Sequence, residues 1–510
     1  MDISRRTLRT LGAAFAAAAL LFSGCSSGSS TSAAAQPPPS VPAALKPYYE
    51  QTLQWRGCGG AGFQCATLRA PLDYARPGGR ELKLAVSRKK ATGSGQRLGS
   101  LLVNPGGPGG SAIGYLQSYA AVGYPARVRA RYDMVAMDPR GVAASEPVRC
   151  LTDQQMDAYT QTDQTPDAPA ERDRLVAAFK KFARGCADRS GKVLAHVSTV
   201  EAARDMDLLR AALGDNRLTY VGASYGTFLG ATYADLYPSR VGRLVLDGAL
   251  DPALSSRRMN LDQTTGFETA FTAFAKDCVR RDNCPLGTRS VANARDRLGS
   301  FFTRLDSRPV ATGGSRRLGE SLATTGVMAA MYDESAWPQL RTALRAALRG
   351  EGGGLLNLAD LYYERDADGS YANLMYANPA VNCLDLPAAF RTPAEVEKSL
   401  PAFRKASPVF GGALAWSALN CAYWPVPATG RPRALTAKGA APIVVVGTTR
   451  DPATPYAWAR SLARQLSSAT LLTYEGDGHT AYGRGSRCID DAINTYLVSG
   501  RPPAAQQRCR

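Results

Sequence analysis

The sequence predicts an α/β fold, with a mostly parallel sheet interrupted by a large helical insertion. Between residues 82 and 250, short and nearly continuous apolar runs alternate with helical patterns. From 251 to 435, long helical patterns separated by breaks rich in Gly, Pro and Asn take over, and strand-like apolar runs return after residue 435. Alternation of apolar strands with helices is typical of a parallel sheet covered on both faces. We therefore expect one sheet whose two parts are separated in the chain by a helical lid.

The expected strands and helices follow this order along the chain. The strands are Leu82–Arg88, Leu101–Asn104, Tyr132–Met137, Leu218–Val221, Arg243–Asp247, Pro442–Val446 and Ala469–Tyr474. The helices are Val200–Leu213, Thr227–Leu236, Met259–Arg281, Val291–Leu305, Ala336–Leu348 and Thr392–Arg404. These elements divide the chain into an N-terminal part of the core at 46–250, a helical lid at 251–435 and a C-terminal part of the core at 436–510.

The first 45 residues are expected to serve export. Arginines at positions 5, 6 and 9 precede an uncharged, mostly apolar run at 11–22. That run is shorter than the ~20 residues that cross a bilayer and is typical of a signal peptide, expected at 1–25. Small residues before Cys25 resemble a lipoprotein cleavage site, so membrane attachment through a lipid on Cys25 is one alternative and an unlipidated signal the other. The paired arginines leave the twin-arginine and ordinary export routes open. Residues 26–45, rich in Ser, Ala, Gln and Pro, are expected to form a flexible tether.

The cysteines point to an oxidising compartment. The chain has 11 cysteines, and ten remain without Cys25, an even number that favours disulfides in an exported protein. Metal binding is the alternative, but the chain has no C-x-x-C motif and only 2 histidines. Pairing of sequence neighbours is the simplest hypothesis: Cys58–Cys65, Cys150–Cys186, Cys278–Cys284, Cys383–Cys421 and Cys488–Cys509. We expect an extracellular or cell-envelope protein.

Composition and charge exclude several classes of protein. With 510 residues, 45% hydrophobic and 20% charged, the chain is neither disordered nor a small disulfide scaffold. The formal net charge of +18 comes from arginines spread along the chain. Because no zinc-finger spacing, RNA-binding motif or basic arm is present, this charge favours a basic surface over nucleic-acid binding.

A nucleophilic serine is expected at position 224. Residues 222–226 read GASYG, between the expected strand 218–221 and the expected helix 227–236. A G-x-S-x-G motif between a strand and a helix forms a sharp turn that presents the serine hydroxyl at the carboxyl edge of the sheet. The glycines allow strand and helix to approach closely. The amide of Tyr225, at the helix N-terminus, is a candidate donor to an oxyanion.

The serine requires a base and a carboxylate that orients it. His479 lies in a glycine-rich loop just after an expected strand, whereas His196, the alternative, precedes the serine in the chain. Asp451 follows the apolar run 442–446 and is the favoured carboxylate. Asp477 is its rival, although its short distance from His479 in sequence favours a role in the turn. The order Ser224, Asp451, His479 is that of α/β-hydrolases.

A second oxyanion donor is expected in a loop after an early strand. Residues 104–111 read NPGGPGGS, and their glycines let backbone amides face a ligand. Gly107 is the candidate donor. A phosphate-binding loop is the alternative, but no Gly-Lys-Ser/Thr follows. Chemistry of this kind needs no metal and no organic cofactor, so neither is expected.

Together these motifs resemble a known family. NPGGPGGS at 104–111, DPRG at 138–141, GASYG at 222–226, DPATP at 451–455 and GDGHTAY at 476–482 are similar to motifs of the secreted tripeptidyl aminopeptidases of actinobacteria. These are prolyl-aminopeptidase-like serine peptidases of the α/β-hydrolase fold. The resemblance covers about residues 45–510. It implies the same triad and oxyanion residues, a helical lid, and release of short peptides, often tripeptides, from a free N-terminus.

The resemblance leaves the substrate-binding residues and two other functions open. Holding the α-ammonium group of a peptide substrate requires a carboxylate in the lid, and Asp385 and Glu268 are the candidates. An exported esterase or lipase is the alternative enzyme, because the same triad performs both reactions. A catalytically silent envelope protein that binds a ligand is the third alternative.

Overall fold

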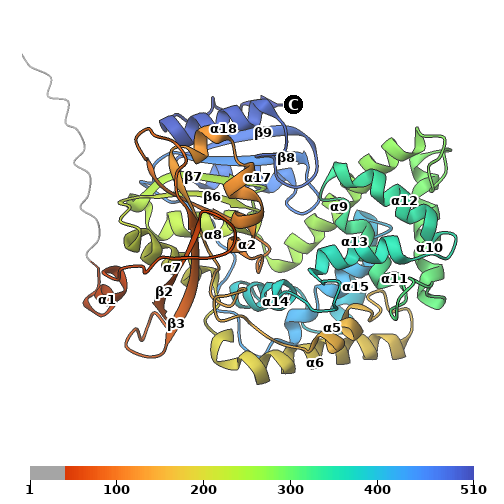
Figure 1. Ribbon diagram of the computed structural model, residues 1–510. Coiled ribbons are helices and arrows are strands. Elements are labelled where there is room, and N and C mark those ends of the chain that lie inside the picture. Colours follow the sequence, from red (N-terminus) through yellow and green to blue (C-terminus); the bar gives the residue numbers. More distant parts are fainter. Residues whose placement is uncertain (1–40) are drawn as a thin grey trace, which may run out of the picture. The chain divides into compact units, whose positions relative to one another are not determined.

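The structure, a computed structural model, describes residues 41–510 and contains one ten-stranded sheet (Figure 1). The expected signal peptide, Cys25 and the tether up to residue 40 lie outside the described residues. The strands are β1 (Arg56–Gly57), β2 (Phe63–Pro71), β3 (Glu81–Lys89), β4 (Gly99–Asn104), β5 (Tyr132–Met137), β6 (Leu218–Ala223), β7 (Val241–Asp247), β8 (Ile443–Arg450), β9 (Ala469–Asp477) and β10 (Arg508–Cys509). Their order is β1-β2-β3-β5-β4-β6-β7-β8-β9-β10.

The sheet is parallel from β5 to β10 and antiparallel at its other end. β1 with β2, β2 with β3, and β3 with β5 are antiparallel pairs, and the remaining neighbours are parallel. The expected strand at 82–88 therefore belongs to an antiparallel hairpin, and its partner β2 was not expected. The reason is that β2 alternates between buried and accessible residues, so it lacks the continuous apolar run that marks the central strands.

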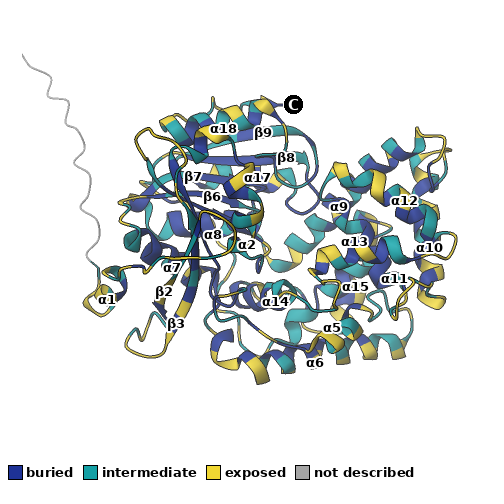
Figure 2. Ribbon diagram, viewed as in Figure 1, coloured by how far each residue is buried: buried dark blue, intermediate teal, exposed yellow. Residues whose placement is uncertain are grey.

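Helices cover both faces of the parallel strands. The apolar core on one face joins the sheet to α7 (Thr199–Ala212), α8 (Tyr225–Leu236) and α17 (Tyr456–Gln465). The core on the other face joins it to α2 (Ala112–Tyr115), α4 (Ala126–Arg129) and α18 (Arg487–Ser499). Successive residues of one strand serve opposite faces, as Leu101 and Leu102 of β4 show. Burial on both faces explains why these strands read as unbroken apolar runs; Figure 2 shows them buried.

A helical layer lies between β7 and β8 in the chain. Its helices are α9 (Ser256–Val279), α10 (Val291–Ser307), α11 (Glu320–Ala329), α12 (Trp337–Ala347), α13 (Gly353–Tyr363), α14 (Leu374–Asp385), α15 (Pro393–Ala406) and α16 (Gly411–Ser417). The layer has its own apolar core, which includes Phe271 and Phe274 of α9 and Phe302 of α10. Ser255, Ser290 and Thr392 cap the N-termini of three of these helices through side-chain oxygens.

The helical layer also includes chain from before residue 251. Helix α6 (Pro169–Leu194) packs Leu175 and Phe179 against residues of α15 and α16. Helix α5 (Asp153–Thr160) is joined to the layer by an ion pair of Asp157 with Arg365, at 2.8 Å. In Figure 1, α5 and α6 lie beside α14 and α15. The boundary expected at residue 251 therefore divides the layer in two, because contacts between helices ignore their separation in sequence.

All five expected disulfides are confirmed. The bridges join Cys58–Cys65, Cys150–Cys186, Cys278–Cys284, Cys383–Cys421 and Cys488–Cys509. Cys383 lies on α14, so its bridge fixes the helix that carries Asp385. Between residues 41 and 510, no helix is long and apolar enough to cross a membrane.

Candidate active site

Ser224 occupies a strained turn between β6 and α8. Its φ of 55° and ψ of −125° are unusual for a residue that carries a Cβ. The turn is tight enough that a Cβ on Gly222 would lie 2.3 Å from the carbonyl oxygen of Gly226. Both glycines are therefore required by close approach of strand and helix, as the motif predicts. The Ser224 amide donates to the carbonyl oxygen of Asp247 at 2.8 Å, which fixes the turn against β7.

The glycine-rich loop after β4 lies directly on this turn. A Cβ on Gly106 would be 2.9 Å from the Ser224 Cβ and 2.9 Å from the Tyr225 nitrogen. Gly106 and Gly107 have φ values of 94° and 112°, which glycine adopts without strain. Tyr225 is the first residue of α8, so its amide has no acceptor within the helix. Gly107, Ser224 and Tyr225 line the same cavity.

Asp451 and His479 form a hydrogen-bonded pair. Nδ1 of His479 lies 2.9 Å from Oδ1 and 3.0 Å from Oδ2 of Asp451. Asp451 is buried at the end of β8 and also accepts hydrogen bonds from the amides of Ala453, Thr454 and Thr480. These donors hold its carboxylate toward the imidazole. A carboxylate on Nδ1 leaves Nε2 of His479 as the basic nitrogen.

The histidine loop is joined to the serine turn through Asp247. The carboxylate of Asp247 accepts from the amides of Ala481 and Tyr482, while its carbonyl oxygen accepts from Ser224. Burial raises the pKa of Asp247, and the two amides counteract this by favouring the ionised carboxylate. Within the described part of the chain, no hydrogen bond joins the Ser224 hydroxyl to His479. Such bonds often form only when substrate is bound.

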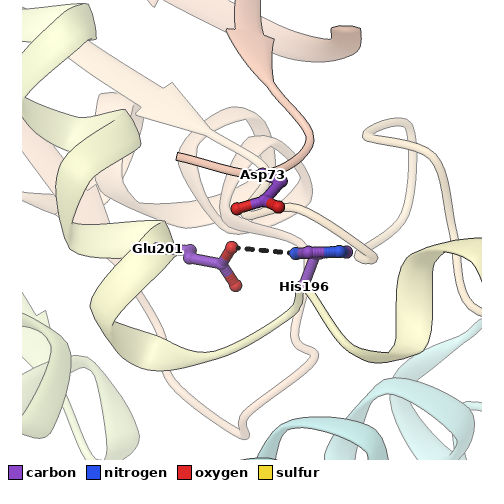
Figure 3. Close-up of side chains that lie close together, drawn as sticks. All are labelled: Asp73, His196 and Glu201. Carbon is purple, nitrogen blue, oxygen red and sulfur yellow. Dashed lines mark hydrogen bonds and ion pairs between the residues drawn. The ribbon is translucent and has the colours of Figure 1, made fainter. Parts of the chain in front are cut away.

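The two rivals of these residues have other partners. Asp477 forms a bidentate pair with Arg450, at 2.6 and 2.7 Å. Nδ1 of His196 lies 3.1 Å from Oε1 of Glu201, with Asp73 nearby (Figure 3). Asp73 is paired with Arg76 at 2.9 Å and Glu201 with Arg140 at 3.5 Å. These carboxylates are thus balanced by arginines, and His196, Glu201 and Asp73 do not line the cavity that contains Ser224.

The cavity above Ser224 lies between the sheet and the helical layer. Its volume is about 330 Å³, and residues of α8, α9, α13, α14 and α16 line it. Tyr332 and Thr454 line it as well, and both contact His479: the Tyr332 ring packs edge-on against the imidazole, and the Thr454 hydroxyl lies 3.3 Å from Nδ1. Access to Ser224 therefore passes beneath the helices.

The two candidate substrate carboxylates differ in position. Asp385 lines the cavity and is buried, and its carboxylate accepts two hydrogen bonds from Thr199. Burial raises its pKa to about 7, and repulsion by Glu201 adds to this. Glu268 lies outside that cavity. It is paired with Arg295 at 2.6 Å and accepts from the Ser407 hydroxyl, so its charge is already neutralised.

Comparisons with known proteins agree with this geometry. A family model described as "TAP-like protein" matches residues 407–509. The serine protease Hip1 of Mycobacterium tuberculosis H37Rv is 39% identical over 490 residues, which cover 91% of this chain and 92% of the relative. Carboxylesterase B of the same strain is 40% identical, covering 88% and 86%. The tripeptidyl aminopeptidase of Streptomyces lividans is 33% identical, covering 88% and 83%. The chain belongs to the TAP-like family of α/β-hydrolases.

Membership of the TAP-like family confirms the expected fold and makes the protein a serine hydrolase. The five disulfides indicate an exported protein whose cysteines are oxidised outside the cytoplasm.

The expected site residues are surrounded by three residues that were not expected from the sequence: Thr454, Asp247 and Thr199. Asp247 carries a detectable signal, because it ends the strand next to the one that precedes Ser224. Thr454 follows Asp451 by three residues, a spacing that a turn can close. Thr199 carries no local signal, since its partner is 186 residues away.

Proposed function

We propose that this protein is an exported aminopeptidase that releases short peptides from free N-termini through an acyl-enzyme on Ser224. The observation that carries the proposal is the charge of the cavity. Among the described residues that line it, Asp251 and Asp385 are the only Asp, Glu, Lys, Arg or His side chains. A cavity lined by two acidic residues and no cationic one suits a substrate that brings its own cation, and the α-ammonium of a peptide is such a group.

We assign the α-ammonium to Asp385. This carboxylate is buried without an arginine or lysine partner among residues 41–510, and burial raises its pKa to about 7. An ammonium group placed against it would favour the ionised form and supply the missing counter-charge. Glu268, already paired with Arg295, has no charge to offer.

The proposed reaction is acyl transfer in two steps. Nε2 of His479 takes the Ser224 proton as Oγ bonds to the scissile carbonyl carbon, and Asp451 stabilises the imidazolium. The amides of Gly107 and Tyr225 bind the oxyanion, each contributing about 3 kcal/mol in comparable sites. His479 then protonates the leaving amine as the C–N bond breaks. Water, activated by the same imidazole, attacks the ester carbonyl of the acyl-enzyme, the bond to Oγ breaks, and Ser224 regains its proton from His479 as the short peptide leaves with a free carboxylate.

The finer features of the proposal have separate support. Release of tripeptides is supported by the relative named tripeptidyl aminopeptidase. Peptides with free N-termini are the proposed partners. Attachment to a membrane through a lipid on Cys25 is a further proposal from the sequence, since Cys25 lies outside the described residues. Mass spectrometry of the mature N-terminus tests it.

Rates on three substrates test the proposal. They are a tripeptide anilide, its N-blocked analogue and a short acyl ester. We expect the free-amine anilide to be cleaved at least about tenfold faster than the blocked one, because a charge-assisted contact contributes about 1.5–3 kcal/mol. Ser224→Ala should abolish turnover of all three while the folded state, monitored by circular dichroism, is retained. Equal rates on the free and blocked anilides would contradict aminopeptidase action, and an active Ser224→Ala would contradict the nucleophile.

An esterase is the second candidate, favoured by the relative named Carboxylesterase B. Its signature would be fast cleavage of the ester and no dependence on a free amine. A silent binding protein, the remaining alternative, would fail to react with a fluorophosphonate probe.

A further inference from the structure

One buried side chain, that of Thr199, connects Tyr225 of the expected oxyanion hole to Asp385 in the cavity. The Tyr225 hydroxyl lies 2.5 Å from Oγ1 of Thr199, and that hydroxyl lies 2.5 Å from Oδ2 of Asp385. The Thr199 amide donates to Oδ1 of Asp385 at 2.8 Å. The three residues come from α7, α8 and α14, and each is at most 7% exposed. Thr199 is therefore the point at which the core and the helical layer meet beside the cavity.

We propose that Thr199 is a positioning residue, which orients Asp385 toward the substrate's α-ammonium and couples it to Tyr225 in the oxyanion hole. The inference rests on the function proposed above and adds a residue that does not itself touch substrate.

The direction of the hydrogen bonds supports this role. The Thr199 hydroxyl has one proton, which it donates to Oδ2 of Asp385. The Tyr225 phenol, which burial keeps protonated by raising its pKa, is therefore the donor to Thr199. Thr199 thus places one donor on each oxygen of the carboxylate. Each carboxylate oxygen can accept two hydrogen bonds, so one position on each remains available to an ammonium group from the cavity.

The same contacts favour the charged form of Asp385. Both hydrogen bonds from Thr199 lower its pKa against the opposing effects of burial and of Glu201 on α7. Loss of the hydroxyl raises the pKa of Asp385 further, so the carboxylate would be protonated over more of the neutral range. A protonated carboxyl has no charge to attract an ammonium group.

The test is Thr199→Val, which removes the hydroxyl and keeps the shape and the amide. We expect kcat/KM for the free-amine tripeptide anilide to fall about tenfold, mainly through KM. The rate on the short acyl ester should change far less, because the ester has no amine. The acidic limb of the pH profile for the anilide should move to higher pH. Thr199→Ser keeps a hydroxyl at this position, so it should show the wild-type kcat/KM for the anilide and the wild-type acidic limb.

Two further variants separate positioning from stability. Ser290→Ala removes the N-cap of α10, where Ser290 accepts from the Asn293 amide, and Ser290 contacts neither the three linked residues nor Glu201. It should lower the melting temperature and leave the ratio of anilide to ester rates unchanged. Tyr225→Phe keeps the oxyanion amide and the bonds from Thr199 to Asp385. It should lower the ratio of anilide to ester rates, as Thr199→Val does, but by less. If Thr199→Val does not fold, Tyr225→Phe provides the test.

The outcomes distinguish this inference from the proposed function. Suppose that the wild type prefers the free-amine anilide. If folded Thr199→Val and Tyr225→Phe keep that preference and the wild-type acidic limb of the pH profile, the inference is overturned and the proposed function stands. If the wild type cleaves free and blocked anilides equally, the proposed function fails and the inference fails with it. If the ratio of anilide to ester rates falls equally in Ser290→Ala, Thr199 has only a structural role.

Discussion

The hydroxyl group of Thr454 contacts both members of the Asp451–His479 pair. Thr454 donates its amide to Oδ1 and its hydroxyl to Oδ2 of Asp451, and the same hydroxyl lies 3.3 Å from Nδ1 of His479. We expect Thr454→Val to lower kcat/KM about tenfold, because a hydrogen bond to a charged group contributes about 1.5–3 kcal/mol. The loss should be equal for anilide and ester, which distinguishes it from the selective loss expected for Thr199→Val. Steady-state kinetics on both substrates measure it.

Thr303→Val is the matched control, since Thr303 is exposed on α10 and, among residues 41–510, its hydroxyl bonds only to the carbonyl oxygen of Gly299. It should leave the rates unchanged. A Thr454→Val enzyme with wild-type rates would show that the backbone amides alone fix Asp451.

The residues proposed for catalysis could be selected from the sequence because each sits in a local pattern. Ser224 lies between two glycines that the turn requires, and Asp451 follows a buried strand. The contact of Thr454 with His479 and that of Thr199 with Asp385 could not be predicted, because each joins residues that are far apart in sequence. Thr454 meets His479 across 25 residues and Thr199 meets Asp385 across 186. Only the packed structure determines those distances.

One helix of the layer rests directly on the loop that carries Asp451. A Cβ on Gly266 of α9 would lie 2.4 Å from the carbonyl oxygen of Pro452 and 3.2 Å from that of Asp451. Because backbone atoms are the obstacle, Gly266→Ala must move the helix or the loop. We expect a loss of about 1–3 kcal/mol in the free energy of unfolding and a fall in kcat/KM, as Asp451 shifts relative to His479. Urea unfolding and kinetics on the ester measure the two effects.

Gly299→Ala on α10 is the control, because nothing lies within 4 Å of the new Cβ. It should stabilise the protein by about 0.5–1 kcal/mol, since alanine favours the helix, and leave the kinetics unchanged. Wild-type activity in Gly266→Ala would mean that the close packing does not position the triad.

Elements with a strong periodic pattern could be predicted, and those shaped by their neighbours could not. The expected helix 291–305 matches α10 at its start and ends two residues early. Helix α14 was missed because Pro379 interrupts its pattern, and α13 because it opens with two glycines. Helix α13 buries apolar residues in the core of the helical layer and α14 buries them in the core of the sheet, and this packing outweighs their poor local propensity.

The molecule as a whole joins two apolar cores with different origins. The sheet core forms from strands that the sequence marks clearly, whereas the core of the helical layer draws on chain from both before and after β6 and β7. A linear division of the sequence could therefore recover the sheet but not the full layer. The cavity, Asp385 and Thr199 all lie where the two cores meet, so substrate recognition depends on how they pack together.

Stability of the whole molecule should increase as the solution becomes mildly acidic. Burial raises the pKa of Glu320 from 4.5 to about 7; the Thr165 hydroxyl opposes this, and Asp163, Asp306 and Asp167 add to it by repulsion. Burial does the same to Asp385. Between about pH 4.5 and 7 the folded state therefore binds more protons than the unfolded state, so stability grows as pH falls through this window.

We expect a melting temperature about 2 °C or more higher at pH 6 than at pH 8, measured by calorimetry. Glu320→Gln should raise the value at pH 8 and flatten the dependence, while the exposed Glu351→Gln should not. Two results would contradict this prediction: a melting temperature that falls toward pH 6, or a Glu320→Gln protein whose melting temperature depends on pH as in the wild type. Either would show that burial of the ionised Glu320 carboxylate does not destabilise the folded state.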